Sequence, residues 1–513
     1  MRSWPRHRHF RVVVNGEGQY GIWPVDSALP SGWWAVGFAG TRPSCLGYVA
    51  ETWRDMRPRT VARRPAAGAR PATPSMDSSG AVAQAGPTAM PAMPATPATL
   101  VDLFARGANR QPGAVAVSDD AGQLTYAELA VRSDRLAMGL AALGVAAEDR
   151  VLLALPSSVD SVVALVGVAK AGAASLPIDT DGLGSDVAGV LGVASVQLVL
   201  TRPGGDRPVS RLRAASQPGP QTVDWGSAMT AGALPAALAG QPDGPAGGNA
   251  ACVLPARSPA GELRYVVLEH RQLVPLALDP TLLALQPGDR AAPATGLAAA
   301  AAQVEIWRAL AEGAEIVVLP PDQRSSPDLA AALGRREVSA LSAPAAEVDR
   351  LARLPAAGGE PAGALAGALG SLRMLHATGT GLQPATVRAL RAAGFTGRLL
   401  TRYGPVETAA TAAVHELSGE PERTDGVPLG RPPAGVRLYV LQEDLGPVPP
   451  GTPGELYVGG VAVGRGYLDD PERTADAFLP DPFSSGGRMY PTGELVTRQA
   501  DGVLRHLGPA GDP

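Results

Sequence analysis

The chain has 513 residues, of which 45% are hydrophobic, and carries a formal net charge of −4 at pH 7. This length allows two to four domains and the core of a large enzyme, while the slightly acidic balance argues against nucleic acid as the main partner. The longest apolar run, residues 162–169, stops at Lys170. A membrane helix needs roughly 18 or more apolar residues, so no membrane association is expected.

Cysteine, histidine and lysine usage narrows the chemistry further. Cys45 and Cys252 are too few for a disulfide framework and fit a reducing, cytoplasmic compartment. The six histidines are dispersed, which argues against a zinc site. The basic residues 2–11 precede no apolar run of signal-peptide length. Lys170 is the only lysine, so a mechanism that needs a lysine must use Lys170 or borrow one from elsewhere.

Residues 1–60 form the first predicted domain. Short β-prone runs at residues 12–14, 20–23 and 35–38, separated by glycine and proline, predict a small antiparallel sheet. Residues 45–53 have apolar residues near helical spacing, which predicts one helix against that sheet. So small a domain has little interior, and we expect some of its tryptophans on a docking surface. Five of the seven tryptophans lie in the first 53 residues: Trp4, Trp23, Trp33, Trp34 and Trp53.

Composition divides the rest of the chain into a linker and two further parts. Residues 61–98 are mostly alanine, proline, serine and methionine; they bury too little surface to offset the entropy of ordering, so we expect a semi-extended linker. Residues 99–425 alternate strand and helix patterns, which predicts a layered α/β domain. Residues 426–513 change to short strands with Gly/Pro turns, which predicts a smaller β subdomain. The clearest expected strands are residues 151–155, 197–200, 315–319, 437–441, 455–458 and 503–507, and the clearest helices are residues 124–143 and 331–338.

A set of motifs in the first domain carries a family resemblance. The motifs are Asn15-x-Glu17-x-Gln19, Trp23-Pro24, Pro30-x-Gly32-Trp33, Cys45-Leu46 and Trp53-x-Asp55-Met56-Arg57-Pro58. They make residues 9–58 similar to the MbtH-like proteins, small activators that bind the adenylation domains of nonribosomal peptide synthetases. The resemblance implies a three-stranded antiparallel sheet plus a helix, with Trp23 and Trp33 flanking a cleft for a small partner residue. The alternative is that these rings only fill a core, as is expected for Trp53.

Five motifs in order carry a second resemblance, from Thr99 to the end of the chain. They are Leu124-Thr125-Tyr126-x-Glu128-Leu129, Lys170-Ala171-Gly172 with Leu176-Pro177-Ile178-Asp179, Tyr403-Gly404-Pro405-Val406-Glu407, Gly454-Glu455-Leu456 with Gly464-Arg465-Gly466-Tyr467-Leu468, and Tyr490-Pro491-Thr492-Gly493-Glu494-Leu495. This part resembles the adenylation domains of the adenylate-forming superfamily, which implies two α/β subdomains and a small β-barrel subdomain.

The order of the two resemblances implies an activator fused to its client. Their docking would be intramolecular, at a local concentration of roughly millimolar. By the resemblance, an alanine of the client's GRPxA segment enters the tryptophan cleft, and here that alanine is Ala434. The alternative is that Ala434 is a loop alanine without a role.

The second resemblance implies a site for ATP and Mg²⁺. Adenylation joins a carboxylate to the α-phosphate of ATP and releases pyrophosphate, mostly through positioning and charge neutralisation. The resemblance places Tyr403 on the adenine with Gly379 and Thr380 on the base's other side. It makes Glu407 the catalytic Mg²⁺ ligand and gives the ribose hydroxyls to Glu494, which replaces the usual aspartate. Further expected nucleotide contacts are Thr401, Ser258, Gly261 and Arg264.

Several positions depart from the family pattern. The phosphate loop TSGSTGxPKG aligns with residues 256–265, where only Ser258, Gly261 and the guanidinium groups of Arg257 and Arg264 remain useful. The negative charge of Glu262 repels a polyphosphate. Val406 replaces the threonine of the family motif YGPTE and so removes a hydroxyl for the phosphates. The family's arginine before the hinge aligns with Pro509, and its hinge aspartate aligns with Gly511. The family's C-terminal subdomain, with its second lysine, is missing from this chain, so we expect nucleotide and acid to be bound better than they are turned over.

The family's specificity positions outline a substrate pocket. They fall on Ala300, Ala301, Val304, Leu341, His376, Thr378, Arg402, Ala410 and Thr411. Ala300 replaces the aspartate that pairs with the substrate α-ammonium in amino-acid-activating members. Arg402 would be an unpaired buried charge unless something completes it, and a second substrate carboxylate would do so. We therefore expect an acidic side chain, as in aspartate, a β-methylated aspartate or another dicarboxylate. The alternatives are a salt bridge from Arg402 to a protein acid such as Glu407, and a packed neutral ring for His376.

Two functions from different classes fit these residues. The first is an adenylating ligase of natural-product (antibiotic) biosynthesis, which would act on an amino or dicarboxylic acid and pass it to a carrier protein in the full-length enzyme. The second is a non-catalytic binding scaffold that keeps the adenylation fold with a degenerate phosphate loop. An acyl-CoA ligase of the same superfamily is disfavoured, because the activator-like domain serves peptide synthetases.

Overall fold

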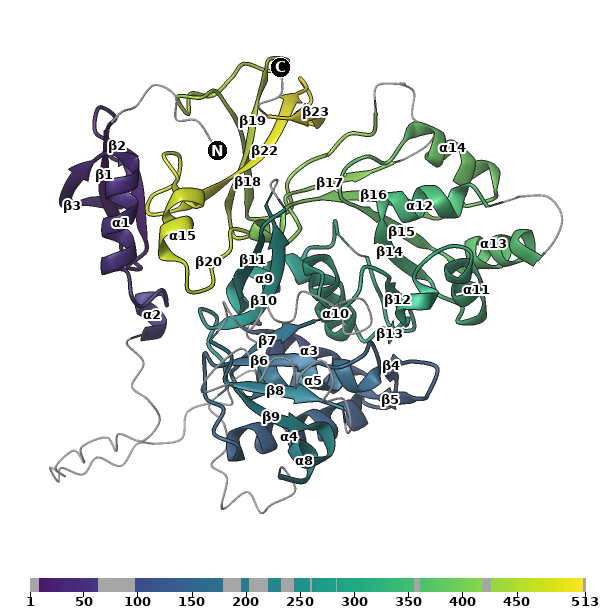
Figure 1. The fold of residues 1–513 in the computed structure, drawn as a ribbon. Helices are drawn as coiled ribbons and strands as arrows, with labels where there is room; N and C mark the ends of the chain where they lie inside the picture. The colour runs from purple at the N-terminus through teal and green to yellow at the C-terminus, as the bar shows by residue number, and fades with distance from the viewer. Residues whose placement is uncertain are drawn as a thin grey trace, which may run out of the picture.

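The computed structural model describes residues 9–62, 97–178, 195–202, 220–231, 244–258, 261–282, 284–354, 360–417 and 426–510. Trp4, Asp179, Gly511 and nearly all of the predicted linker (residues 63–96) lie outside these ranges. In Figure 1 the N-terminal part (purple) lies beside the C-terminal β subdomain (yellow), and two α/β lobes (blue and green) make up the rest of the molecule.

Residues 9–62, called the first unit below, fold as a three-stranded antiparallel sheet in the order β2-β1-β3 with a helix packed on it. Gly18 takes a left-handed conformation (φ 76°) in the β1–β2 turn, and the Thr41 side chain caps the helix at the backbone N–H of Ser44. Trp53 is buried in the core of this unit, as expected. The elements are β1 Phe10–Asn15, β2 Tyr20–Pro24, β3 Trp33–Gly40, α1 Arg42–Thr52 and the short α2 Arg59–Ala62.

The first lobe contains a seven-stranded sheet in the order β20-β11-β10-β7-β6-β8-β9. Its centre is parallel, whereas β10, β11 and β20 form an antiparallel edge. Helix α5 is apolar on every side and lies buried, which is why its sequence gave the longest apolar run. The strands are β6 Arg150–Ala154, β7 Ala174–Pro177, β8 Leu198–Thr201, β9 Gln221–Asp224, β10 Ala250–Arg257, β11 Leu263–Glu269 and β20 Gly466–Tyr467. The helices are α3 Leu100–Arg110, α4 Tyr126–Ala142, α5 Val159–Lys170 and α8 Trp225–Ala231.

The second lobe contains an eight-stranded sheet in the order β17-β16-β15-β14-β12-β13-β4-β5. Helix α10 packs against α3 and α9 and so lies between the two lobes (Figure 1). The strands are β4 Val115–Ser118, β5 Gln123–Thr125, β12 Arg290–Pro293, β13 Glu315–Val317, β14 Ala340–Pro344, β15 Met374–Thr378, β16 Arg398–Tyr403 and β17 Ala413–Glu416. The helices are α9 His270–Leu278, α10 Ala300–Glu312, α11 Asp328–Arg335, α12 Ala345–Ala352, α13 Glu360–Ser371 and α14 Pro384–Ala392, with short 3-10 turns η1 Pro321–Gln323 and η2 Val406–Thr408.

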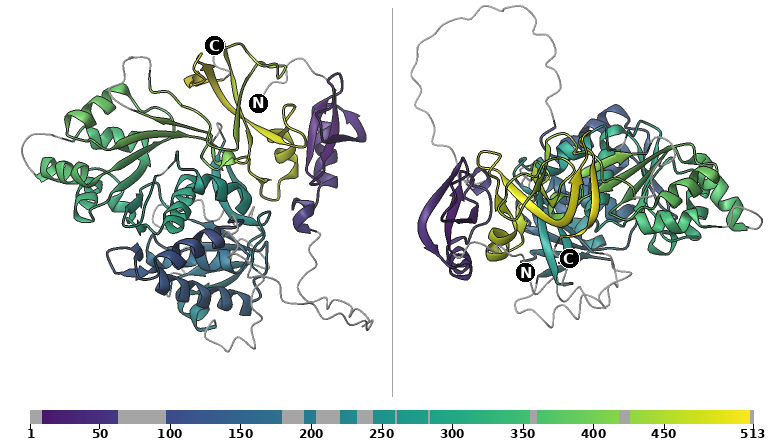
Figure 2. Two further views of the ribbon diagram at one scale, coloured as in Figure 1. Left: turned by 180° about the vertical axis from the view of Figure 1, so that it is seen from behind. Right: turned by 90° about the horizontal axis from the view of Figure 1, so that it is seen from above.

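The C-terminal β subdomain is a five-stranded antiparallel sheet with one short helix. Seen from above in Figure 2, this subdomain stands between the first unit and the rest of the molecule. Across the described ranges, no helix is long and apolar enough to cross a membrane. The elements are β18 Val436–Leu441, β19 Pro453–Gly460, β21 Leu479–Pro480, β22 Arg488–Arg498, β23 Leu504–Pro509 and α15 Pro471–Ala477.

Candidate active site

Trp23 and Trp33 of the first unit face the β subdomain. Both rings are buried in one apolar cluster with side chains from β18, β19, β21, β22 and the β18–β19 turn. Trp33 Nε1 donates a hydrogen bond to the carbonyl of Gly487 (3.1 Å). A side chain at Gly32 would place its Cβ 2.4 Å from the backbone nitrogen of Gly486, so this close approach requires glycine. The paired indoles thus contribute to an interface within the chain, as expected.

The residue at this interface is not the expected one. Ala434 is exposed, its backbone N–H donates to the carboxylate of Asp279 (2.7 Å), and it is not part of the buried cluster around Trp23 and Trp33. Its segment is held there because Arg431 and Gly430 exchange backbone hydrogen bonds with Val414 and Leu504. The prediction that Ala434 enters the cleft is therefore wrong.

The first unit instead contacts α15 and β21: Leu479 of β21 lies in the cluster of Trp23 and Trp33. A Cβ on Gly21 of β2 would lie 3.2 Å from the ring of Pro480 and 3.6 Å from that of Trp33. Ala475 is fully buried in the core cluster of the first unit. Sequence reasoning missed this segment. The available signal was the small and apolar residues at 475–480, which follow a polar turn.

The candidate nucleotide residues gather where the parallel strands β15 and β16 end, the edge at which ligands bind in open α/β sheets. Tyr403 is the last residue of β16 and is buried. Gly379 follows β15 in a left-handed conformation (φ 89°) and donates its N–H to the carbonyl of Arg402 (2.9 Å). Gly379 and Thr380 are exposed. Thr401 is buried and its hydroxyl donates to the Pro428 carbonyl (3.3 Å), so it serves the fold in this structure.

Glu407 lies in η2, directly after Tyr403, and is buried. The hydroxyl of Tyr467 donates to its Oε1 (2.8 Å). The turn behind it is tightly held: Ala409 and Ala410 are both left-handed (φ 52° and 51°), and the Ala410 N–H donates to the Pro405 carbonyl (3.0 Å). The structure thus presents one buried, oriented carboxylate, although sequence reasoning gave no role to Tyr467.

One carboxylate matches the way Mg²⁺ is commonly held, by one or two carboxylates together with substrate phosphates and water. Within the described part of the chain, no group of three or more His, Cys, Asp or Glu side chains could hold a metal by itself. The donor set therefore fits a magnesium ion that arrives with a nucleotide and does not fit a permanent protein-only metal centre.

Glu494 lies on β22, near Tyr403. Burial raises the pKa of the Tyr403 hydroxyl well above its usual range, and the nearby carboxylates of Glu494 and Glu407 add to the effect. Nε2 of His506 on β23 lies 2.6 Å from Oε2 of Glu494, leaving the other carboxylate oxygen for a ligand hydroxyl. Glu494, distant in sequence, is therefore brought close to Tyr403 and Glu407 of the YGPVE motif.

The aligned phosphate loop is the turn of the β10–β11 hairpin, and its donors are largely used inside the turn. Gly261 N–H donates to the Ser258 carbonyl (2.8 Å), and Glu262 N–H donates to the Ser258 hydroxyl oxygen (3.1 Å). Arg264 pairs with Glu262 (3.1 Å) and its guanidinium stacks 5.3 Å from the centre of the Tyr467 ring. Arg264 thus contacts the same tyrosine whose hydroxyl bonds Glu407. Pro259 and Ala260 lie outside the described residues.

Lys170, the only lysine, lies at the end of α5 and serves packing. Its Nζ pairs with Asp134 (2.6 Å), donates to the Ala130 carbonyl (3.2 Å) and stacks on the ring of Phe104 (4.9 Å). No lysine of this chain is therefore available at the candidate nucleotide site.

Arg402 and His376 lie at the base of the candidate acid pocket, both buried. Arg402 forms an ion pair with Glu305 of α10. Its charge is therefore paired within the protein, and the partner is Glu305 and not Glu407. Its Nε and Nη1 have no hydrogen-bond partner among the described residues. Burial and the neighbouring Arg402 lower the pKa of His376 to about 3, so the ring is neutral near pH 7. Sequence reasoning missed Glu305, because it lies 97 residues from Arg402 and nothing in the sequence of α10 marks this contact.

The other pocket candidates line the same region with small or apolar groups. Ala300, Ala301 and Val304 are buried on α10, and Leu341 of β14 lines a hollow with Glu305. Thr378 pairs in register with Arg402 across β15 and β16. The hydroxyls of Thr378 and Thr411 donate to backbone carbonyls of Ala343 (3.3 Å) and Ala409 (3.0 Å).

Comparison with known proteins adds family membership to this geometry. Residues 104–468 match the family model described as AMP-binding enzyme, and residues 5–65 match the one described as MbtH-like protein. Phosphinothricin tripeptide synthetase PhsB of Streptomyces viridochromogenes is 35% identical over 423 residues, which are 79% of this chain and 33% of that protein. AMB antimetabolite synthetase AmbB of Pseudomonas aeruginosa is 33% identical over 407 residues, 79% of this chain and 31% of that protein. The chain spans between 5% and 33% of the length of the curated relatives compared.

Solved structures share the fold of the second part. The nonribosomal peptide synthetase FmoA3 superposes with a TM-score of 0.69 at 28% identity over 80% of this chain and 42% of that chain, and it has been solved in an AMPPNP-bound form. The N-terminal subdomain of Klebsiella oxytoca NpsA, in complex with 3-hydroxybenzoyl-AMSN, superposes with a TM-score of 0.69 at 22% identity over 80% of this chain and 98% of that chain.

Proposed function

The chain belongs to the AMP-binding enzymes and carries an MbtH-like domain on the same polypeptide, and we propose that it activates an amino or dicarboxylic acid as an acyl-adenylate in natural-product biosynthesis. The observation that carries this proposal is the convergence of Tyr403 at the end of β16, Glu407 in the turn η2 that follows it, and Glu494 on β22 of the β subdomain. An aromatic face, a carboxylate for a hard cation and a second carboxylate for hydroxyls are what a bound nucleotide needs.

In this proposal the nucleotide is ATP. Tyr403 supplies one face for the adenine, Gly379 and Thr380 border the other, and Glu494 accepts the ribose hydroxyls while His506 fixes its other oxygen. Glu407 would hold Mg²⁺, which neutralises phosphate charge when bound. Arg264 supplies a further positive charge beside the ring of Tyr467, whose hydroxyl bonds Glu407. Ser258 and Gly261 contribute less, because their groups already bond within the hairpin turn.

The substrate in this proposal has an acidic side chain, as in aspartate or a 3-methylaspartate. The support is Arg402, whose Nε and Nη1 have no partner in the described part of the chain and lie buried. Buried donors left unpaired cost free energy, so a carboxylate that accepts from both would be favoured. Glu305 already offsets part of the charge of Arg402, and the pocket therefore recognises the carboxylate mainly through directed hydrogen bonds.

We further propose that binding exceeds turnover in this chain, because Lys170 is held by Asp134 and no other lysine exists to contact carboxylate and phosphate together. A carrier protein that receives the acyl group is also part of the proposal. It is suggested by the artificially fused adenylation–PCP di-domain NpsA–ThdA, which has the same fold.

Calorimetric titration of ATP with Mg²⁺ tests the proposal against a non-catalytic scaffold. We expect a dissociation constant below about 1 mM, weakened at least about tenfold by Tyr403→Ala, because the ring supplies base stacking. Trp34→Ala, the truncation of an exposed ring on β3 outside this site, is the control and should keep nucleotide affinity. No ATP binding at several times that concentration would reject the enzyme and favour the scaffold.

A further inference from the structure

The segment Gly464–Pro480 lies between the first unit and Glu407, and it touches both. It begins with strand β20, continues through α15 and ends with β21, and the first unit lies beside α15 (Figure 1). The contacts can be followed in order from the first unit to the candidate magnesium ligand.

The first unit holds α15. Ala475 is fully buried among Phe10, Ile22, Val49 and Trp53, and Arg42 pairs with the carboxylate of Asp476 (Nε to Oδ1 2.8 Å). A seven-residue helix is not stable by itself. The orientation of α15 therefore depends on what it packs against, and much of that surface belongs to the first unit.

Helix α15 in turn holds Tyr467. The backbone N–H of Tyr467 donates to Thr474 Oγ1 (2.9 Å), and a Cβ at Gly466 would lie 2.4 Å from the Thr474 methyl group, so strand and helix are in close contact. The ring of Phe478, which follows α15, packs edge-on against the Tyr467 ring with centroids 5.4 Å apart. Backbone and ring of Tyr467 are thus both fixed by this helix and the residue after it.

Tyr467 reaches Glu407 with its hydroxyl (2.8 Å), and both side chains are buried. The backbone also connects them, because Gly464 N–H donates to the Glu407 carbonyl (2.8 Å). A hydrogen bond to a carboxylate is strong and directional. It fixes which way the Glu407 oxygens point, which matters for a group that must meet a cation.

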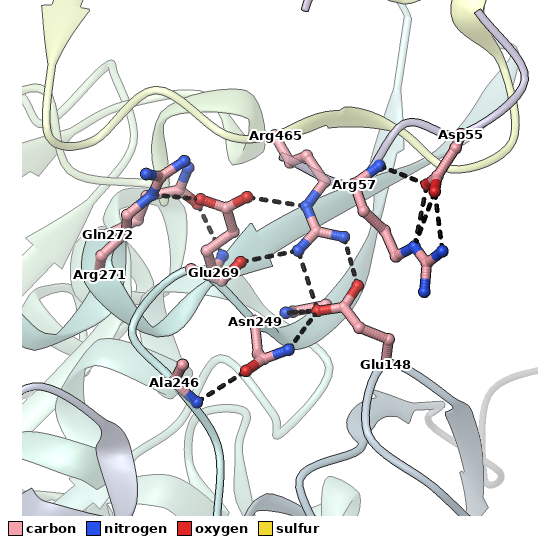
Figure 3. Close-up of polar contacts among 11 residues, drawn as sticks. Asp55, Arg57, Glu148, Ala246, Asn249, Glu269, Arg271, Gln272 and Arg465 are labelled. Atoms are coloured by element: carbon pink, nitrogen blue, oxygen red, sulfur yellow. Dashed lines mark hydrogen bonds and ion pairs between the residues drawn. The ribbon is translucent and has the colours of Figure 1, made fainter. Parts of the chain in front are cut away.

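The other end of the segment is anchored by a buried ion network (Figure 3). Arg465 pairs with Glu148 (2.7 Å) and Glu269 (2.8 Å) and donates to the Gly248 carbonyl (2.9 Å). Figure 3 shows Asp55 and Arg57 of the first unit beside this network. A Cβ at Gly248 would also lie 3.0 Å from Val61. The first unit therefore contacts the surroundings of Tyr467 at two places.

We propose that Tyr467 is a positioning residue through which the docked first unit, by way of α15, orients Glu407 for magnesium nucleotide. This inference rests on the proposed function for the role of Glu407, and it assigns a route that neither family membership nor the motifs supply.

Tyr467→Phe tests the last step, because it removes only the hydroxyl and keeps the ring packing. ATP affinity is measured by calorimetry with Mg²⁺ and again with EDTA. The Mg²⁺ gain is the ratio of the ATP affinity with Mg²⁺ to the ATP affinity with EDTA. We expect this gain to fall about tenfold, because one charge-assisted hydrogen bond is lost. The ATP affinity with EDTA should stay unchanged. A purely structural role would change both values. Tyr439→Phe, whose hydroxyl bonds Asp481 (3.0 Å), makes the same chemical change elsewhere and should alter neither. An unchanged Mg²⁺ gain in Tyr467→Phe would overturn the proposal.

Ala475→Arg tests the route, with Arg42→Ala as a milder variant if the first does not fold. Either variant should lower the Mg²⁺ gain when it is introduced into the wild type. It should have little further effect when it is added to Tyr467→Phe, because the docking change and the Tyr467 change would break the same chain of contacts. Additive effects would overturn the route through Tyr467.

Hydrogen exchange on the ligand-free protein keeps this test separate from the proposed function. Ala475→Arg and Arg42→Ala should raise amide exchange in residues 404–412, around Glu407, and Tyr439→Phe should not. Unchanged exchange there would overturn the relay even if ATP binds well. If the wild type fails to bind ATP with Mg²⁺, the proposed function falls, and the exchange data still decide whether docking orders the Glu407 segment.

Discussion

Arg402 of β16 and Glu305 of α10 form a buried ion pair that joins the sheet of the second lobe to the helix between the lobes. Burial raises the pKa of Glu305, and the adjacent Arg402 opposes that rise. The pair therefore joins the two elements at the base of the candidate pocket and sets the net charge there.

Glu305→Gln should make the pocket more selective for acidic substrates, because Arg402 then keeps its whole charge. Unfolding should become easier by about 3–5 kcal/mol, the usual cost of breaking a buried pair. Substrate binding by calorimetry and denaturant unfolding measure the two effects. Asp134→Asn, which removes an exposed partner of Lys170, is the matched control and should cost less than about 1 kcal/mol. A falling affinity for aspartate relative to uncharged amino acids would contradict this account of the pocket.

Gly21→Val should release the first unit from the β subdomain. Valine suits a strand, but its Cβ would press on Pro480 at 3.2 Å and its methyl groups would go further. The measurement is gel filtration after proteolytic cleavage introduced between residues 63 and 96, which asks whether the first unit stays bound. Ala434→Glu is the control and should leave the parts together, since Ala434 is exposed and faces Asp279. Release by Ala434→Glu alone would restore the sequence-based docking hypothesis.

Stability should fall as the pH drops from about 6.5 toward 4. Burial lowers the pKa of His270 to about 4 and that of His376 to about 3, so the unfolded chain binds protons that the folded chain does not. Each histidine then contributes a slope of up to about 1.4 kcal/mol per pH unit in that window. Nδ1 of His270 accepts the Leu100 N–H (3.2 Å), which asparagine can also do. His270→Asn should therefore flatten the dependence of the urea midpoint between pH 7 and 5, and the same exchange at exposed His9 controls for losing a histidine.

Glu262→Gln should strengthen ATP binding by about two- to fivefold, more at low ionic strength, because it removes an exposed negative charge from the turn proposed to face the phosphates. The change also frees Arg264 from its 3.1 Å pair. Calorimetry at two salt concentrations checks both points. Glu337→Gln, an exposed acid in the second lobe, is the control. An equal gain in both variants would show a general charge effect and count against a phosphate-facing turn.

Much of the fold was predictable, because local patterns and family motifs agreed. The three strands and the helix of the first unit, and the strands around residues 151 and 455, occur where apolar periodicity put them. The helix expected at residues 331–338 instead spans Asp328–Arg335. Glu337 takes a left-handed conformation (φ 47°) just beyond it, a backbone turn that no side-chain pattern indicates.

The site was predictable to the extent that motifs mark backbone positions. Tyr403 and Glu407 belong to one motif and were placed together, and Glu494 lies near them although its strand β22 belongs to a different sheet. What failed depended on contacts between distant segments. The docking role of Ala434 was inferred only from the resemblance of its GRPxA segment to the family. In the structure the first unit docks on α15 and β21. Glu305 served only as an alignment anchor, since sequence alone gives no sign that it would face Arg402.

The hydrogen bond between Ser31 and Ser485 joins positions 454 residues apart. A ribosome that adds roughly 5–20 residues per second needs roughly 20 to 90 seconds to cover that distance. During this interval the tryptophans of the nascent first unit have no binding surface of their own chain to cover them. Chaperones, or an adenylation domain on another polypeptide, could occupy them first, so the rate of translation becomes a determinant of correct assembly.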